Sequence, residues 1–158
     1  MIGTQKRKLS FPSLNISVKC PYQPAATSFV LDGCCHVLYD KLHLSFSEAR
    51  TYCWKNHGGQ FGSDLAVPLS LVSLYNELQR KGVGPATALW VGALSTATTN
   101  WRWVDGRPVH CHYIISRRKD MCGFFIHLNE YLGKKHVILD INCATQLGFI
   151  CQMQKYQN

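Results

Sequence analysis

The side chains with the clearest chemical potential stand together in one triplet, His110-Cys111-His112. Imidazole nitrogen and thiolate sulfur are ligands that suit zinc and copper. Residues two apart on an extended loop face the same way, so both histidines are placed to chelate one ion. A structural zinc site needs a third and a fourth ligand, and the neighbouring sequence offers none. We therefore predict loop histidines beside a disulfide, with no metal and no cofactor.

The same triplet suggests a second chemistry, a hydrolase with Cys111 as its nucleophile and His110 as its base. Such an enzyme needs a group that activates the nucleophile, and no supporting motif is present. A disulfide at Cys111 would eliminate it, because the thiolate is the reactive species. We expect no catalytic residue, and we keep the Cys/His enzyme as the alternative from another functional class.

The chain of 158 residues contains eight cysteines, an even number. They stand dispersed, at positions 20, 34, 35, 53, 111, 122, 143 and 151. Zinc knuckles bring two ligands close together in the sequence, and that spacing is missing. The pattern indicates disulfides formed in an oxidising compartment. Asn15-Ile16-Ser17, an acceptor for N-glycosylation, agrees with an extracellular protein, either secreted or the ectodomain of a membrane protein.

Length and composition indicate one globular domain with flanks. The chain is 46% hydrophobic and 16% charged, and no apolar run approaches the ~18 residues of a membrane span. The first ten residues lack the apolar core of a signal peptide. The net charge of +8 suggests acidic partners, but the basic residues are scattered, as on a solvated surface. We expect no nucleic acid partner and no insertion into a membrane.

Sequence periodicity predicts helices first and strands later. Ser45 followed by Glu48 is a capping box, and it opens a helix whose apolar stripe carries Cys53 inward. A second helix begins near Ser70 and stops at Gly82. The expected strands are the segments 33–40, 64–68, 88–93, 101–106, 122–128, 136–141 and 148–153. This order indicates an α+β domain.

Three tryptophans fall in the segment 90–106. Trp101 and Trp103 are two apart, so on a strand they point to one face. Two large aromatic side chains on one face are most simply a core layer, and we expect one of them to be partly exposed at a loop edge. Trp90 lies on a separate short strand that ends at Gly92.

Taken in order, these features resemble the C-type lectin-like domain. The resemblance rests on Trp90-Val91-Gly92, the Trp-x-Trp-x-Asp-Gly stretch 101–106, the helix bearing Cys53, the segment 65–68 and the spacing Cys143-x7-Cys151. It implies two helices packed on small antiparallel sheets, stabilised by disulfides, and it places Trp90 in the core. The domain would cover residues 20–153, between a basic flank or linker, 1–19, and a C-terminal tail, 154–158.

The resemblance also implies how the cysteines pair. The pairs are Cys53–Cys151, Cys122–Cys143, and Cys20 with Cys35 or with Cys34. Cys111 and the remaining cysteine of the 34–35 pair are left unassigned. They pair with each other, bridge to another chain or stay free, and the sequence does not choose among these.

Calcium-dependent sugar binding is not expected. Members of the family that bind sugars hold Ca²⁺ with carboxylate and amide side chains at two places, and calcium needs six to eight oxygen ligands. In the long loop this chain offers Asp120 as its sole carboxylate, among basic residues. The second place lies just before Cys143. There Asp140 is the one carboxylate that remains, and Asn142 offers a further side-chain oxygen.

The leading interpretation is an extracellular recognition module that binds a protein ligand or receptor without calcium. Its expected surface is the 107–121 loop together with neighbouring strands, and in this loop apolar side chains stand beside arginine. The candidate contacts are Tyr113, Ile114, Ile115, Arg117, Arg118 and Lys119. The runner-up is calcium-independent binding of an anionic, sulfated glycan. Its candidate contacts are Arg117, Arg118, Lys119, Lys134 and Lys135.

Overall fold

The computed structural model describes Cys20 and residues 27–59, 62–96, 100–115, 118–134 and 136–153. The expected flank, the expected tail and Asn15 lie outside the described residues. Among the helices in the described ranges, none has the length and apolar character needed to cross a membrane.

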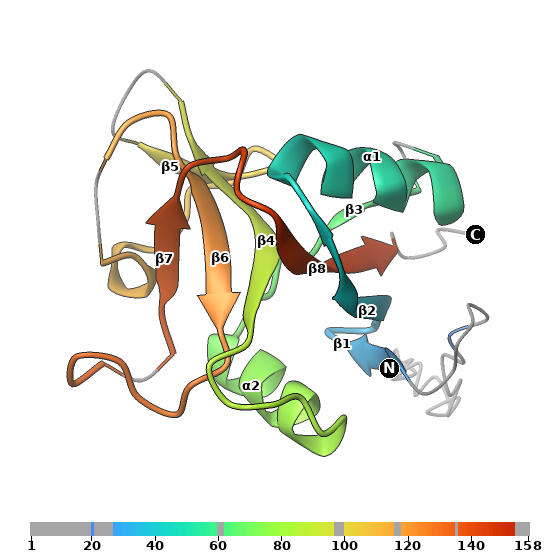
Figure 1. Cartoon of the computed structure of the whole chain (residues 1–158), viewed down its shortest axis with the longest axis horizontal. Coiled ribbons are helices and arrows are strands. Elements are labelled where there is room, and N and C mark those ends of the chain that lie inside the picture. The colour runs from blue at the N-terminus through green and yellow to red at the C-terminus, as the bar shows by residue number, and fades with distance from the viewer. Residues whose placement is uncertain are drawn as a thin grey trace, which may run out of the picture.

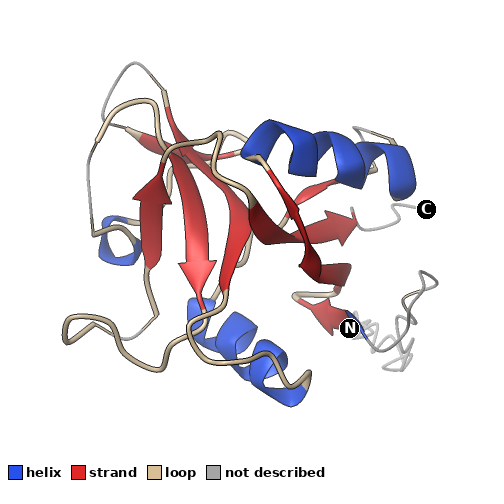
Figure 2. Ribbon diagram, viewed as in Figure 1, coloured by secondary structure: helices blue, strands red, loops and turns tan. Residues whose placement is uncertain are grey.

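The described ranges contain two α-helices and a sheet of eight strands (Figures 1 and 2). The strands are β1 (Ser28–Leu31), β2 (Cys34–Leu44), β3 (Ser63–Leu65), β4 (Ala88–Ser95), β5 (Trp101–Trp103), β6 (Cys122–Ile126), β7 (Ile138–Ile141) and β8 (Leu147–Met153). The helices are α1 (Phe46–Asn56) and α2 (Leu71–Arg80), with a 3-10 turn at Cys111–Tyr113. The α+β class predicted from the sequence is confirmed.

The sheet differs in one respect from the small antiparallel sheets expected. Its strand order is β1-β2-β8-β4-β6-β7, with β3 on β8 and β5 on β4. All of these pairs are antiparallel except β4 and β8, which run parallel and join the two halves into one mixed sheet. A parallel pair requires a long crossover, and the chain from 96 to 146 supplies it.

Helix α1 begins where the sequence predicted. The backbone N–H of Glu48 donates to Ser45 Oγ at 3.3 Å, and Ser45 Oγ donates to the Glu48 carboxylate at 2.8 Å. The residues buried on α1 are Phe46, Ala49 and Cys53. This face packs α1 against β3 and β8, in the upper right of Figure 1.

Helix α2 also follows its predicted pattern. Ser70 caps it by accepting from the N–H of Ser73 at 3.2 Å. Leu71, Leu74 and Leu78 are fully buried, and the positive φ of 72° at Gly82 lies just beyond the helix end. Figure 1 shows α2 near β1 and the lower end of β4, away from α1.

The three tryptophans of the segment 90–106 belong to the core. Trp90 is fully buried, and its indole N–H donates to the carbonyl of Leu44 at 2.9 Å. Trp101 and Trp103 are 5% and 6% exposed, so the expectation of one partly exposed ring is wrong. The backbone of residues 107–109 returns along β5 and is hydrogen-bonded to it.

Three disulfides tie these elements together, and they are the pairs that the resemblance implied. Cys53–Cys151 joins α1 to β8, Cys122–Cys143 joins β6 to the turn before β8, and Cys20–Cys35 holds the N-terminal hairpin. Cys34 is a buried free thiol and Cys111 is an exposed one. The long loop therefore carries an unpaired cysteine.

Candidate functional site

The candidate site lies where the chain leaves β5, turns back along it and forms the 3-10 turn. A cavity of about 290 Å³ opens there beside Cys111. It is lined by Asn100, Trp101, Arg102, Pro108, Val109, Cys111 and Ile114. Asn100, Arg102, Pro108 and Val109 were not among the candidate contacts expected from the sequence, although Pro108 and Val109 lie in the expected 107–121 loop. The available signal was the Asp105-Gly106 turn, which sends the following residues back beside β5.

Local hydrogen bonds explain this path. The side chain of Asp105 accepts from the backbone N–H of Arg107 at 3.1 Å, and Gly106 takes a positive φ of 90°. The N–H of Trp103 then donates to the carbonyl of Arg107, and the N–H of Val109 donates to that of Trp101. The 3-10 turn therefore starts from a position fixed against β5.

The far end of the turn is also held. Ile114 forms a parallel bridge with Ile138, the first residue of β7. Tyr113 and Ile114 are half-buried and pack on the core beside α2 and β5. The 3-10 turn is thus anchored on both sides, while His110, Cys111 and His112 themselves are exposed.

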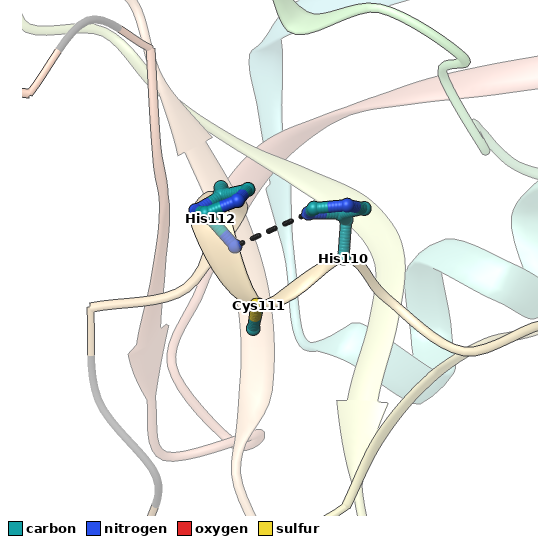
Figure 3. A group of neighbouring side chains, drawn as sticks. All are labelled: His110, Cys111 and His112. Carbon is teal, nitrogen blue, oxygen red and sulfur yellow. Dashed lines mark hydrogen bonds between the residues drawn. The ribbon is translucent and has the colours of Figure 1, made fainter.

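Within the turn, the rings of His110 and His112 stack with centroids 4.6 Å apart (Figure 3). The backbone N–H of His112 donates to Nδ1 of His110 at 3.4 Å. One ligand atom from each of the three residues lies within 4.8 Å of the other two. The prediction that these histidines flank a disulfide is wrong, because the cysteine between them is a free thiol.

One wall of the cavity contains an unused hydrogen-bond donor. Trp101 is 5% exposed, and its indole N–H is buried with no acceptor among the described residues. The side chain of Arg102, exposed on the same short strand, adds a cation to the lining. A ligand group that accepts hydrogen bonds would therefore find the charged donor of Arg102 in the lining, whereas the indole N–H of Trp101 lies beneath the surface.

The predicted contact residues do not all remain available. Arg118 donates through Nε to the Asp140 carboxylate at 2.8 Å and through a terminal nitrogen to the Asp140 carbonyl at 3.2 Å. Hydrogen bonding to that carboxylate raises the pKa of Arg118. Ile115 is half-buried and Lys119 is exposed, whereas Arg117 lies outside the described residues.

At the second of the two calcium positions, Asp140 and Asn142 already have partners. Asp140 has a side chain only 6% exposed, and its partner is the guanidinium of Arg118. Asn142 accepts through Oδ1 from the N–H of Ala144 at 2.9 Å, which stabilises the turn before β8. A calcium ion here would have to compete with a fixed cation for one carboxylate.

Among the residues proposed for an anionic glycan, the ones that the structure describes do not form one patch. Arg118 and Lys119 precede β6, whereas Lys134 precedes β7. Because Cys122 pairs with Ile141 and Phe125 with Ile138, the start of β6 lies opposite the end of β7. Lys119 and Lys134 thus stand at opposite ends of the strand pair, and Lys135 lies outside the described residues.

Comparisons with known proteins identify this architecture. No protein-family model matches the chain, and no curated protein matches it by sequence. Among solved structures, the C-type lectin CEL-I from Cucumaria echinata superposes with a TM-score of 0.64 at 18% identity, over 86% of this chain and 98% of its own. A calcium-dependent type II antifreeze protein, solved without calcium, gives 0.60 at 22% identity, over 85% of this chain and 100% of its own.

A third similar structure is the C-type lectin domain of the murine dendritic cell inhibitory receptor 2, solved in complex with an N-glycan. Its TM-score is 0.63 at 17% identity, over 86% of this chain and 99% of that domain. At such low identity the similarity concerns the fold, and it spans nearly the whole of each of these structures.

Proposed function

Since the chain has the C-type lectin-like fold, we propose that it is an extracellular recognition module that binds a protein partner without calcium. The module occupies residues 20–153. The observation that carries the proposal is the ion pair between Arg118 and Asp140, which occupies the one carboxylate at the second calcium position. The three disulfides support an oxidising, extracellular setting.

We propose the rim of the cavity as the surface that contacts the partner. Arg102 is exposed and lines the cavity with Ile114, and the half-buried Tyr113 and Ile115 flank Ile114 in the chain. Arginine and aromatic side chains contribute strongly to protein interfaces, particularly when apolar groups around them exclude water.

The test is capture of extracellular proteins by the immobilised full chain, in calcium and in chelator. We expect a specific partner to be retained equally under both conditions. Arg102→Glu should weaken that binding by at least about tenfold, the loss of one interface contact of about 1.4 kcal/mol. Lys41→Glu makes a matched charge change at an exposed position of β2 and should leave binding intact. Retention that requires calcium would contradict the proposal.

A second candidate is recognition of a glycan, which the similarity to the receptor domain solved with an N-glycan favours. The separation of Lys119 from Lys134 argues against one extended anionic glycan bound across both. A glycan array read in calcium and in chelator separates the two functions. Binding to sulfated glycans that falls steeply with added salt would favour the glycan, because exposed charge contacts are screened.

A further inference from the structure

We propose that His110, Cys111 and His112 form a three-ligand site for Zn²⁺, with a fourth coordination position left to water. The proposal rests on the free thiol of Cys111 and on three potential ligand atoms that lie within 4.8 Å of one another (Figure 3). It goes beyond the proposed recognition function and does not depend on it. Three protein ligands and an open fourth position are a common arrangement for exposed zinc.

The ligand types suit zinc. Two imidazoles and a thiolate are borderline and soft ligands, which bind zinc far better than they bind calcium or magnesium. The thiol must lose its proton to coordinate, so binding forms one S–Zn bond and releases one proton to solvent. No change of oxidation state is involved, since Zn²⁺ has no redox chemistry in proteins.

The distances require only small side-chain movements. With Zn–S of about 2.3 Å and Zn–N of about 2.0 Å, ligand atoms of a tetrahedral site are about 3.3–3.6 Å apart. The present spacing of up to 4.8 Å must therefore shrink by roughly an ångström. All three side chains are exposed, so rotation about their side-chain bonds disturbs no core packing.

The position of His110 is compatible with coordination. Its Nδ1 accepts a hydrogen bond from the backbone N–H of His112. At 3.4 Å that hydrogen bond is long and weak. A metal ion would replace it at little cost, and the stacked ring of His112 stands beside it to supply the second nitrogen.

The backbone of the turn is fixed before any ion arrives. The N–H of Tyr113 donates to the carbonyl of His110 at 2.9 Å, which closes the 3-10 turn. Val109 is hydrogen-bonded to Trp101 on one side, and Ile114 bridges to Ile138 on the other. An ion thus orders three side chains without ordering a flexible loop, which lowers the entropic cost of binding.

The surroundings leave room for the fourth ligand. Cys111 lines the cavity of about 290 Å³, a volume sufficient for several water molecules. A water on the ion would lie toward a cavity that Arg102 also lines. A cation in that position suits an anionic or carbonyl oxygen that replaces the water.

The test is metal titration of the full chain with its disulfides intact. Zn²⁺ added to the metal-free protein should bind with one-to-one stoichiometry in calorimetry. Co²⁺ should give the near-ultraviolet charge-transfer band of a cobalt–thiolate bond. Zn²⁺ should also slow alkylation of Cys111, with the buried Cys34 as an unreactive internal reference.

Three variants and one control decide the assignment. Cys111→Ser should abolish the cobalt–thiolate band, and His110→Ala and His112→Ala should each weaken Zn²⁺ binding by at least about tenfold. His43→Ala, which removes an exposed histidine on β2, should leave the affinity unchanged. Absence of binding, or equal affinity in all variants, overturns the proposal. So does a purified chain in which Cys111 is consumed by an intermolecular disulfide.

Discussion

The guanidinium of Arg118 and the carboxylate of Asp140, 22 residues apart in the sequence, meet at 2.8 Å across the start of β6 and the end of β7. Asp140 is the better buried partner, with a side chain 6% exposed against 61% for Arg118. The fold thus supplies a counterion for Asp140, the carboxylate considered from the sequence as a calcium ligand.

Calcium is therefore expected to leave stability unchanged. A site of ~10 μM affinity in ~1 mM calcium would add about 2.7 kcal/mol and raise Tm by several degrees. We expect melting curves in calcium and in chelator to agree within about a degree. A calcium-dependent rise that disappears in Asp140→Ala would show that Asp140 leaves Arg118 to bind the ion.

The disulfide between α1 and β8 should matter most for stability. Cys53 and Cys151 are 98 residues apart, against 15 for Cys20 and Cys35. In the chain-entropy model the longer loop contributes about 4.7 kcal/mol to the free energy of unfolding and the shorter one about 3 kcal/mol. In urea unfolding, the Cys53→Ala/Cys151→Ala variant should therefore have a lower free energy of unfolding than the Cys20→Ala/Cys35→Ala variant. Non-reducing peptide maps should recover Cys53 with Cys151, and a different partner for Cys151 would contradict the fold.

The two free thiols should differ in reactivity. Cys111 is exposed, whereas Cys34 is 8% exposed at the start of β2. An alkylating reagent should modify Cys111 alone in the folded protein and both residues after unfolding, because a buried thiol is shielded from the reagent. Mass spectrometry of the labelled peptides reads this directly. Equal labelling of Cys34 in the native state would mean that the first hairpin opens readily.

Substitution of Gly92 should be costly. A Cβ added there would lie 2.7 Å from Val104 Cγ2 and 3.0 Å from the carbonyl oxygen of Leu65. Gly92→Ala should therefore destabilise the domain by about 1–3 kcal/mol through overpacking. Gly84→Ala is the control, since its Cβ would come no closer than 3.8 Å to Thr87. The comparison requires only thermal unfolding of both variants.

Acid should weaken the domain partly through His36. Burial lowers the pKa of His36 below its ordinary value of 6.5, and its ring stacks on Phe29. The unfolded chain then binds the proton more readily, so stability falls as pH drops below about 6.5 towards the lowered pKa. Denaturant midpoints at about pH 7.5 and about pH 5 measure this loss.

In this experiment His36→Phe should reduce the pH dependence, because it keeps an aromatic ring and removes the titrating group. His43→Phe changes an exposed histidine on the same strand and should behave as the unchanged protein does. The pKa of His57 is also lowered by burial, so part of the dependence should remain. An unaltered pH profile in His36→Phe would assign the whole effect to other groups.

The sequence alone determined the features that depend on neighbours along the chain. The cap formed by Ser45 and Glu48 and the buried leucine stripe of α2 follow from helical spacing. The shared face of Trp101 and Trp103 follows from strand alternation. The order of these signals was specific enough to indicate the fold and two of the three disulfide pairs through a family resemblance, and it left Cys34 or Cys35 as the partner of Cys20.

The tertiary structure decided what depends on residues far apart in the chain. The parallel pairing of β4 with β8, the ion pair of Arg118 with Asp140 and the cavity beside Trp101 arise only when the crossover from 96 to 146 folds back on the sheet. The free state of Cys111 is decided in the same way, because a disulfide forms only where two cysteines are brought within about 4.4–6.8 Å between Cα atoms. Local sequence sets the backbone path of a few residues, whereas packing of the whole core decides which distant side chains meet.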